Sequence, residues 1–323
     1  MLAVVVLLAL GGAGYLLTAF PKVSPAGNEK VDVTPERLAR GEYLTHHVSE
    51  CWSCHSTRDW SLFTAPVEPD SLGKGGEVFT HSMGFPGTLV APNITPAHLK
   101  DWTDGEIIRA LRVGVSKDGR ALFPLMPYQH LAGASKEDLY SIVAYLRNLK
   151  PLANDPPQTK LDFPMNLIVR AIPKDAPPYP AEPDKAKPKA YRKYVMNLAM
   201  CMDCHTPRDA HGKPKPGMDF AGGFTVTWPD GTKTTTANIT PDPGTGIGNW
   251  SKDDFIKYFR LMGEYATTQK TQVQKGDFQT FMPWEQYSGM TDGDLGAIYD
   301  YLILDVKPVR NAVQKSGYAP RKG

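Results

Sequence analysis

The chain has 323 residues, of which 41% are hydrophobic, so it is long enough for two globular domains with cores of their own. Its formal net charge of +2 excludes the strongly basic character that is typical of nucleic-acid-binding proteins. The 29 prolines and 29 glycines indicate that much of the chain forms loops.

An uncharged, apolar stretch of 19 residues runs from Leu2 to Phe20. As a helix it would extend about 28 Å, close to the ~30 Å hydrocarbon core of a bilayer. A cleaved secretory signal is the alternative. Such a signal has basic residues before a shorter apolar region and a small-residue cleavage site after it. Here no basic residue precedes the stretch, and Pro21 and Lys22 end it. We therefore predict a transmembrane anchor over residues 1–21.

Three helices are predicted in the first half of the chain, and each starts from a capping residue: Thr34, Thr103 and Ser135. Proline follows the first cap, and this helix is expected to run to Cys51. A glutamate three positions after the second cap completes a capping box for a helix through Leu111. The third cap precedes apolar residues that are spaced for one helix face. The equivalent helices of the second half are expected at about 188–200, 252–262 and 292–304.

The pattern C-x-x-C-H occurs twice and contains all four cysteines of the chain: Cys51, Cys54 and His55, then Cys201, Cys204 and His205. This pattern is typical of covalent haem c attachment. The two thiols form thioethers to the haem, and the histidine ligates its iron. The sequence therefore predicts two c-type haems.

Two other chemistries use C-x-x-C pairs. Four cysteines can hold a structural zinc ion, and a single pair can act as a redox dithiol. Neither requires a histidine directly after both pairs, and neither explains why the pairs lie about half a chain apart. Haem attachment is therefore the favoured interpretation.

The two motifs belong to a larger internal repeat. Cys51 and Cys201 are 150 positions apart, and further landmarks recur in the same order at separations of 145 to 156. These landmarks are Asn93 and Asn238, Trp102 and Trp250, Met126 and Met282, and Ser135 and Thr291. The repeat predicts two tandem domains, at residues 32–150 and 188–305. A Pro-rich linker at 151–187, expected to be ordered and partly extended, joins them. A basic tail covers residues 306–323.

Met126 and Met282 are the candidates for the second axial ligand of each iron. Each is followed by proline and an aromatic residue, and each lies nine positions before the cap of its domain's last helix. The histidines outside the two motifs have no histidine at the matching place in the other half. A closed sixth position is typical of an electron carrier, whereas an open one is typical of an enzyme or a gas sensor. We predict His/Met ligation at both irons.

Several other matched residues have two open interpretations. Arg58 and Arg208 either neutralise haem propionates or brace loops. Asn93 and Asn238 are expected to bind loop backbone near the haem.

The strings APNITP, WTDGEIIRALRVGVSKDGRALFPLMPY and SKEDLYSIVAYLRNL resemble the haem domains of a known family. It comprises the cytochrome c subunits of membrane-bound alcohol, gluconate and aldehyde dehydrogenases. TANITPDPGTGIGNWSKDDF resembles a further copy of that domain, and LDFPMN resembles the family's inter-domain segment. Those subunits typically carry three haem domains and a C-terminal anchor. Over residues 34–305 the resemblance implies a c-type cytochrome fold, with ligand pairs His55–Met126 and His205–Met282.

The expected fold is mostly α, with two tandem cytochrome c domains of short helices and long loops plus an N-terminal transmembrane helix. We expect that the protein is not an enzyme but an electron-transfer protein or subunit. It relays single electrons in the periplasm from a membrane dehydrogenase or quinol-oxidising complex to a downstream cytochrome or oxidase. It is expected to be a single-pass protein of the inner membrane, with redox proteins as partners and no nucleic acid. The alternative is a dihaem cytochrome c peroxidase, which would need one iron with an open position.

Overall fold

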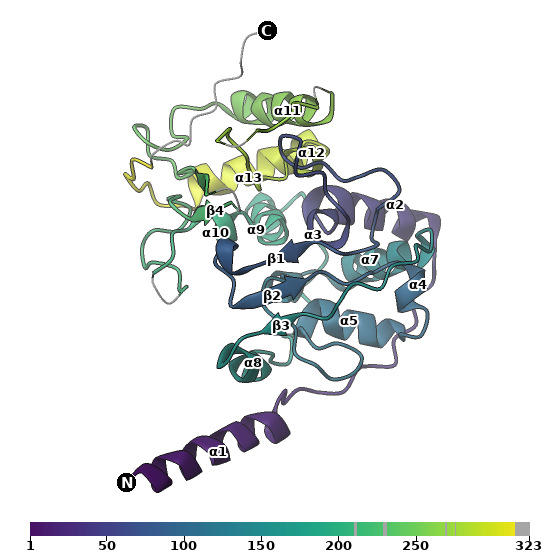
Figure 1. Ribbon diagram of the computed structural model, residues 1–323. Helices are drawn as coiled ribbons and strands as arrows, with labels where there is room; N and C mark the ends of the chain where they lie inside the picture. The colour runs from purple at the N-terminus through teal and green to yellow at the C-terminus, as the bar shows by residue number, and fades with distance from the viewer. Residues whose placement is uncertain (210–211, 229–230, 269, 275, 314–323) are drawn as a thin grey trace.

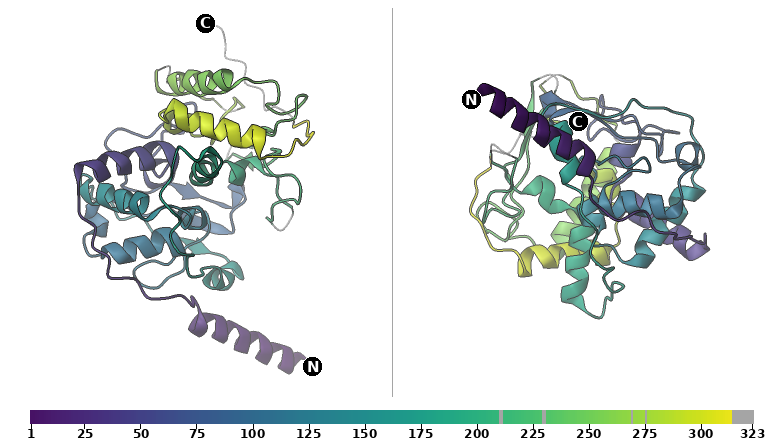
Figure 2. Two further views of the ribbon diagram at one scale, coloured as in Figure 1. Left: turned by 180° about the vertical axis from the view of Figure 1, so that it is seen from behind. Right: turned by 90° about the horizontal axis from the view of Figure 1, so that it is seen from below.

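The computed structural model describes residues 1–209, 212–228, 231–268, 270–274 and 276–313. The basic tail beyond Val313 lies outside the described residues. The described part is mostly helical, as predicted. The two halves of the chain stack on each other, and an N-terminal helix projects from the first half (Figures 1 and 2).

The first half contains all three predicted helices, α2 (Pro35–Tyr43), α5 (Asp104–Val113) and α7 (Lys136–Asn148). Their caps are those that the sequence predicts: Thr34 accepts a hydrogen bond from the backbone N–H of Arg37, and Thr103 and Glu106 form a capping box. Short helices α3 (Trp52–His55), α4 (Pro96–Leu99) and α6 (Tyr128–Leu131) connect them.

The second half repeats this order with α9 (Pro188–Ala199), α10 (Cys201–His205), α11 (Lys252–Thr268), α12 (Trp284–Tyr287) and α13 (Asp292–Leu304). Helix α11 continues beyond the predicted end near residue 262. Gly263 and Ala266 are buried, so its inward face extends over another turn.

The prediction that one regular helix runs from Thr34 to Cys51 is wrong. Helix α2 ends at Tyr43, and a π-helix, η1 (Leu44–Val48), follows it. The equivalent helix α9 has no such segment. Tyr43 and Tyr194 are 151 positions apart, whereas Cys51 and Cys201 are 150 apart, so the first half has one extra residue between these points. A π-turn accommodates an additional residue within a helix, and η1 is where this one is absorbed.

Short strands brace the loops. In the first half β1 (Val78–Phe79), β2 (Gly87–Val90) and β3 (Lys160–Leu161) form an antiparallel sheet, and β3 comes from the linker. In the second half β4 (Thr225–Thr227) pairs with β5 (Lys233–Thr235). The linker is therefore ordered over part of its length. It continues through α8 (Met165–Ile168) and a 3₁₀ turn, η3 (Val169–Ala171). A further 3₁₀ turn, η2 (His81–Met83), follows β1.

The predicted N-terminal helix is present as α1 (Leu2–Ala19), which extends away from the two halves (Figure 1). Among the residues that the structure describes, no helix has both the length and the apolar character needed to cross a membrane.

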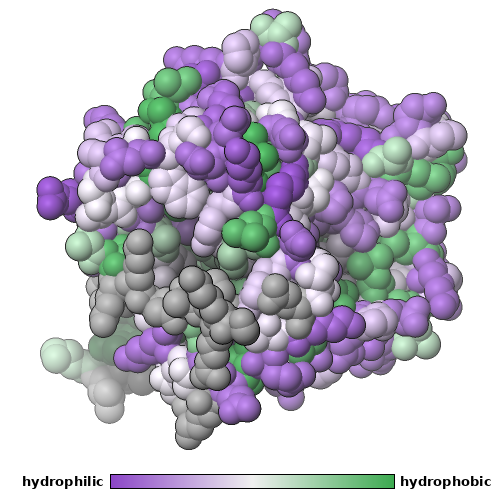
Figure 3. Space-filling view, turned by 90° about the horizontal axis from the view of Figure 1, so that it is seen from above, coloured by the Kyte–Doolittle hydropathy of each residue, from purple (hydrophilic) through white to green (hydrophobic). Residues whose placement is uncertain are grey.

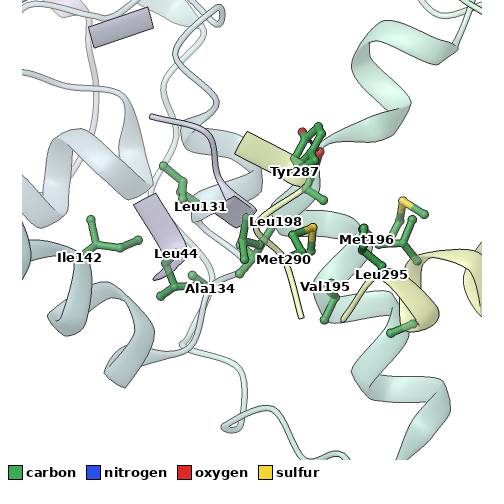
Figure 4. Packing of buried hydrophobic residues seen from close by; sticks show 14 of the residues in the cluster. Leu44, Leu131, Ala134, Ile142, Val195, Met196, Leu198, Tyr287, Met290 and Leu295 are labelled. Atoms are coloured by element: carbon green, nitrogen blue, oxygen red, sulfur yellow. Dashed lines mark hydrogen bonds between the residues drawn. The ribbon is translucent and has the colours of Figure 1, made fainter. Parts of the chain in front are cut away.

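One hydrophobic core runs through both halves. Leu44 and Leu131 come from the first half, and Leu198, Met290 and Leu295 come from the second. Side chains from both halves meet in this cluster, where Leu198 lies beside Met290 (Figure 4). The two haem motifs are therefore carried by halves that share a core.

Polar contacts cross the same interface in matched pairs. The hydroxyl of Tyr43 on α2 donates to Asp294 on α13 at 2.5 Å, and the hydroxyl of Tyr194 on α9 donates to Asp138 on α7 at 2.5 Å. Nearby, His47 Nδ1 lies 2.9 Å from the carbonyl of Gln286, and the side chain of Asn197 donates to the carbonyl of His130 at 2.8 Å. Each half thus uses two matching places to bind the other half: Tyr43 on α2 and His47 on η1 in the first, and Tyr194 and Asn197 on α9 in the second.

Candidate haem-attachment sites

The two C-x-x-C-H motifs form short helices after the same sharp turn. The residue before each motif has a left-handed backbone, with φ of 42° at Glu50 and 54° at Met200. This conformation ends the preceding helix and starts α3 and α10 in a new direction. The two cysteines and the histidine of each motif consequently lie within one short turn of helix.

Each motif histidine is fixed through one ring nitrogen. Nδ1 of His55 lies 2.9 Å from the carbonyl oxygen of Pro92, and Nδ1 of His205 lies 2.7 Å from that of Ala237. Burial lowers the pKa of both histidines, and the carbonyl contact partly opposes this. A neutral imidazole that donates from Nδ1 presents Nε2 as a metal ligand, and its carbonyl partner sets the ring orientation.

Those carbonyls are held in place by the matched asparagines. Asn93 Oδ1 accepts hydrogen bonds from the backbone and the hydroxyl of Thr95, both at 2.8 Å, and its amide donates to two further carbonyls. Asn238 repeats the arrangement with Thr240, at 2.9 and 2.8 Å. The expected contact of both asparagines with loop backbone is therefore confirmed. They fix the residue directly after the carbonyl that binds the histidine.

Two matched glycines complete the turn, and the sequence analysis did not single them out. The backbone N–H of Gly75 donates to the carbonyl of His55 at 2.9 Å, and that of Gly222 donates to His205 at 2.7 Å. Both glycines have φ of 70°, and a Cβ atom would lie 2.5 Å from the carbonyl carbon of Pro92 or 2.4 Å from that of Ala237. The Gly-Gly pair that follows both motifs was the available signal.

The two candidate methionines occupy the same backbone turn. The carbonyl of Met126 accepts from the N–H of Tyr128 at 2.8 Å, and the carbonyl of Met282 accepts from that of Trp284 at 2.8 Å. The prolines between them have φ of −81° and ψ of 44° and 67°, close to an inverse γ-turn. Both methionines are partly buried against the shared core. Their ligation of iron stays a prediction.

The four cysteines are partly exposed, Cys204 the most, yet the pKa of each thiol is raised. Burial raises the pKa of Cys51, Cys201 and Cys204 to about 12 and also raises that of Cys54. A reactive dithiol needs a lowered pKa, so the redox-dithiol alternative is not supported. In the described part of the chain no three His, Cys, Asp or Glu side chains gather into a metal cluster, so the alternative of a shared zinc site is not supported either.

The two motifs lie near the junction of the halves, because η1, just before the first motif, contacts α9, just before the second, and Asp203 of the second motif lies 3.1 Å from His130 of the first half. The charge of Glu50 acts on the thiols of its own motif and also raises the pKa of Cys201 and Cys204. Burial raises the pKa of Glu50 itself to about 7. The sequence places these motifs 150 positions apart and did not predict that they meet.

The paired arginines brace loops. The guanidinium of Arg58 donates to the carbonyls of Ala65 and Thr64 at 2.7 and 2.6 Å, and Arg208 donates to that of Gly212 at 3.0 Å. Several of the competing histidines are also occupied elsewhere, since His46 bonds to Tyr145 and His130 to Asp203.

These residues fit a covalent haem at each motif. Cys51, Cys54 and His55 would hold the first, and Cys201, Cys204 and His205 the second, because each histidine already has Nδ1 engaged and Nε2 available. A haem iron takes a histidine on one side and a methionine on the other in many electron-transfer cytochromes.

Comparison with known proteins supports covalent haem in this chain. The chain is 28% identical to the fructose dehydrogenase cytochrome subunit of Gluconobacter japonicus over 89% of its own length and 57% of that subunit. It is 29% identical to the gluconate 2-dehydrogenase cytochrome c subunit of Pantoea cypripedii over 82% of its own length and 58% of that subunit. The chain thus spans little more than half the length of these relatives. The resemblance to dehydrogenase cytochrome subunits is confirmed, and the peroxidase alternative receives no support.

No protein-family model matches the chain. A diheme cytochrome c-type protein of Cereibacter sphaeroides is 30% identical over 77% of the chain and 80% of its own length. That similarity covers most of both proteins, and the duplicated attachment site accounts for it: the chain belongs to the dihaem c-type cytochromes, whose cofactor is covalently bound haem c.

Proposed function

We propose that this chain is a membrane-anchored electron relay of the periplasm. It takes single electrons from a membrane dehydrogenase or a quinol-oxidising complex and passes them to a downstream cytochrome or oxidase. The relatives named as cytochrome subunits of fructose and gluconate dehydrogenases support a place in such a complex.

The chemistry divides between cofactor and protein. Haem supplies a one-electron change at iron. The chain's residues would hold that iron: the carbonyls of Pro92 and Ala237 orient the histidines that would bind it, and the turns at Met126 and Met282 would offer thioethers of limited freedom. A thioether ligand favours the reduced iron and raises the potential.

The observation that carries the proposal is the meeting of two matched sites. The segment before the first motif, η1, contacts the helix before the second motif, α9, and His130 of the first half lies 3.1 Å from Asp203 within the second motif, so the two haems would lie near one interface. Two closely spaced carriers form a path, whereas an enzyme needs one open iron beside an acid or base.

Membrane attachment is the second part of the proposal. Helix α1 carries no charged residue, and several of its described large side chains are exposed, including Leu7, Leu8 and Leu10 at 65 to 72%. Covalent haem is attached outside the cytoplasm, so a helix in the inner membrane would leave both haem domains in the periplasm. N-terminal sequencing of the membrane fraction tests this, since residues 2–20 are expected in the mature protein. A mature chain that starts near Val23 would rule out the anchor.

Rapid mixing tests the relay. The holoprotein, reduced by two electrons per chain, is expected to transfer both to an excess of an oxidised soluble cytochrome in two one-electron steps. It is expected not to consume hydrogen peroxide, even when half-reduced. Rapid peroxide turnover by the half-reduced protein would contradict the proposed relay and indicate a peroxidase, because peroxide can bind only to an iron whose sixth position is open.

A further inference from the structure

A short part of the linker lies beside the base of the N-terminal helix. Helix α8 and the turn η3 both contact α1. In two of the views α8 lies on the side of the first half from which α1 projects (Figures 1 and 2). We call residues 163–168, which include α8, the linker foot.

Two polar anchors fix α1 to the linker after the foot. The guanidinium of Arg170 donates to the carbonyls of Leu16, Leu17 and Phe20 at 3.1, 2.8 and 2.8 Å. These carbonyls at the end of α1 have no partner within the helix, and a cation there also complements the helix dipole. Asp175 accepts hydrogen bonds from the backbone and hydroxyl of Ser24, at 2.7 and 3.0 Å. The direction of α1 is therefore set by the linker.

The foot exposes large apolar side chains that nothing in the described chain covers. Phe163 is 78% exposed and Ile168 is 44% exposed, and Pro164 between them is exposed as well. At the adjoining end of α1, Tyr15 and Leu17 are 63% and 51% exposed. The apolar surface of α1 thus continues onto the foot.

The charges around the foot are mainly positive. Lys22, Lys160 and Lys174 are exposed. Of the two acidic residues in the same segments, Asp162 pairs with His81, and Asp175 binds the uncharged Ser24 and keeps its negative charge, so the three lysines outnumber the unpaired acid. Exposed lysines beside an apolar surface match the interface of a bilayer that contains anionic lipid.

We propose that the linker foot enters the outer interface of the same bilayer that holds α1, as a second membrane contact. The inference rests on the proposed anchoring of α1 and adds the orientation of the molecule. Since α1 and the foot belong to the first half, the second half points away from the lipid. The face of the molecule opposite α1 is mostly hydrophilic (Figure 3), as expected for a surface that faces water.

Site-directed spin labelling tests the contact. In the holoprotein the four native thiols are consumed by haem, so a label reports only on an introduced cysteine. Phe163→Cys and Ile168→Cys probe the foot in full-length protein, reconstituted in nanodiscs that contain phosphatidylglycerol. Leu261→Cys and Leu304→Cys are matched controls, because these residues are 61% and 64% exposed on α11 and α13. Oxygen, which enters lipid, is expected to relax labels 163 and 168 more than a nickel chelate does. Labels 261 and 304 are expected to show the reverse.

A second measurement uses the wild-type protein, so it does not depend on whether the cysteine variants mature correctly. A lipid with a photoreactive acyl chain is expected to label peptides from residues 1–20 and 160–171 and to leave residues 252–268 unlabelled. If the chain floats with vesicles but position 163 stays accessible to the nickel chelate, the proposed lipid contact of the foot is wrong, and the proposed anchor α1 is unaffected. If labels at the foot are shielded from both reagents, a protein covers it, and the lipid contact is overturned. If the chain does not float at all, the anchor and the foot both fail.

Discussion

Tyr43 and Tyr194 occupy the same place in the two halves, and each hydroxyl bridges the opposite half's last helix. Tyr43 donates to Asp294 and accepts from the backbone N–H of Thr291 at 3.1 Å. Tyr194 donates to Asp138 and accepts from the N–H of Ser135 at 3.0 Å. Both carboxylates are almost fully buried, so they depend on these donors.

Removing either hydroxyl is expected to destabilise the holoprotein, and the two losses should differ. Asp138 keeps two hydrogen bonds from Arg40, at 2.7 and 2.8 Å, whereas Asp294 keeps only the hydroxyl of Tyr191 among side-chain donors of the described chain. We expect Tyr43→Phe to cost about 1–3 kcal/mol and Tyr194→Phe to cost less.

Denaturant unfolding, followed through the haem absorbance, measures both variants. Tyr258→Phe is the control, because that hydroxyl makes no hydrogen bond within the described residues, and its change should stay below about 0.5 kcal/mol. Equal losses for Tyr43→Phe and Tyr194→Phe would show that Arg40 does not compensate.

Gly75→Ala is expected to disturb the first haem site through its histidine. The new Cβ would displace the carbonyl of Pro92, which orients His55, in addition to the strain of a left-handed alanine. We expect a loss of about 2–4 kcal/mol in stability and a shifted reduction potential of one haem. Gly217→Ala separates the two effects, since Gly217 has φ of 74° and no atom within 4 Å of its Cβ position. If Gly217→Ala shifts a haem reduction potential as much as Gly75→Ala does, the proposed role of the Pro92 carbonyl is contradicted.

Met126→Ala and Met282→Ala are each expected to convert one haem from low to high spin without loss of covalent haem. The reason is the matched γ-turn that presents each thioether. Optical and EPR spectra of the oxidised protein measure the change. Met218→Ala, which removes a methionine from a loop of the second half, should leave both haems low-spin. An unchanged spectrum for Met126→Ala or Met282→Ala would mean that its iron has another ligand.

The contact between His130 and Asp203 predicts a pH dependence. Burial opposes protonation of His130, but Asp203, 3.1 Å from Nε2, and the hydrogen bonds with Asn197 together more than offset it, so the pKa of His130 is raised above 6.5. A raised pKa stabilises the fold fully below about pH 6.5, and this contribution is lost as pH rises through the folded pKa. Because Asp203 is 44% exposed, the contribution should stay below about 1 kcal/mol.

Thermal melting between pH 5.5 and 8.5 measures this contribution as the difference between wild type and His130→Gln. The difference should shrink toward the alkaline end. His98→Gln is the control, because His98 makes no ion pair among the described residues. A difference that grows with pH would contradict the assigned direction.

The local features of this fold could be read from the sequence, and the long-range ones could not. Caps such as that at Thr103 depend on a few neighbouring residues and formed as predicted, and the matching Met-Pro sequences form matching turns. Tyr43 and Asp294 are 251 positions apart, and neither residue signals its partner. The π-helix could not be predicted, because one inserted residue leaves the hydrophobic pattern of the helix nearly intact. Position 75 requires glycine because the carbonyl of Pro92 leaves no room for a Cβ atom, and nothing in the neighbouring sequence signals that contact.

The exchange of equivalent contacts between the halves has a consequence for the history of the molecule. An interface in which residue i binds j' while i' binds j is the kind that a two-fold symmetric homodimer makes. A single-domain ancestor that paired with itself would have buried this same surface. Fusion of two copies makes the pairing intramolecular and independent of concentration. It also lets the copies diverge, as they have where Arg40 of one half corresponds to Tyr191 of the other.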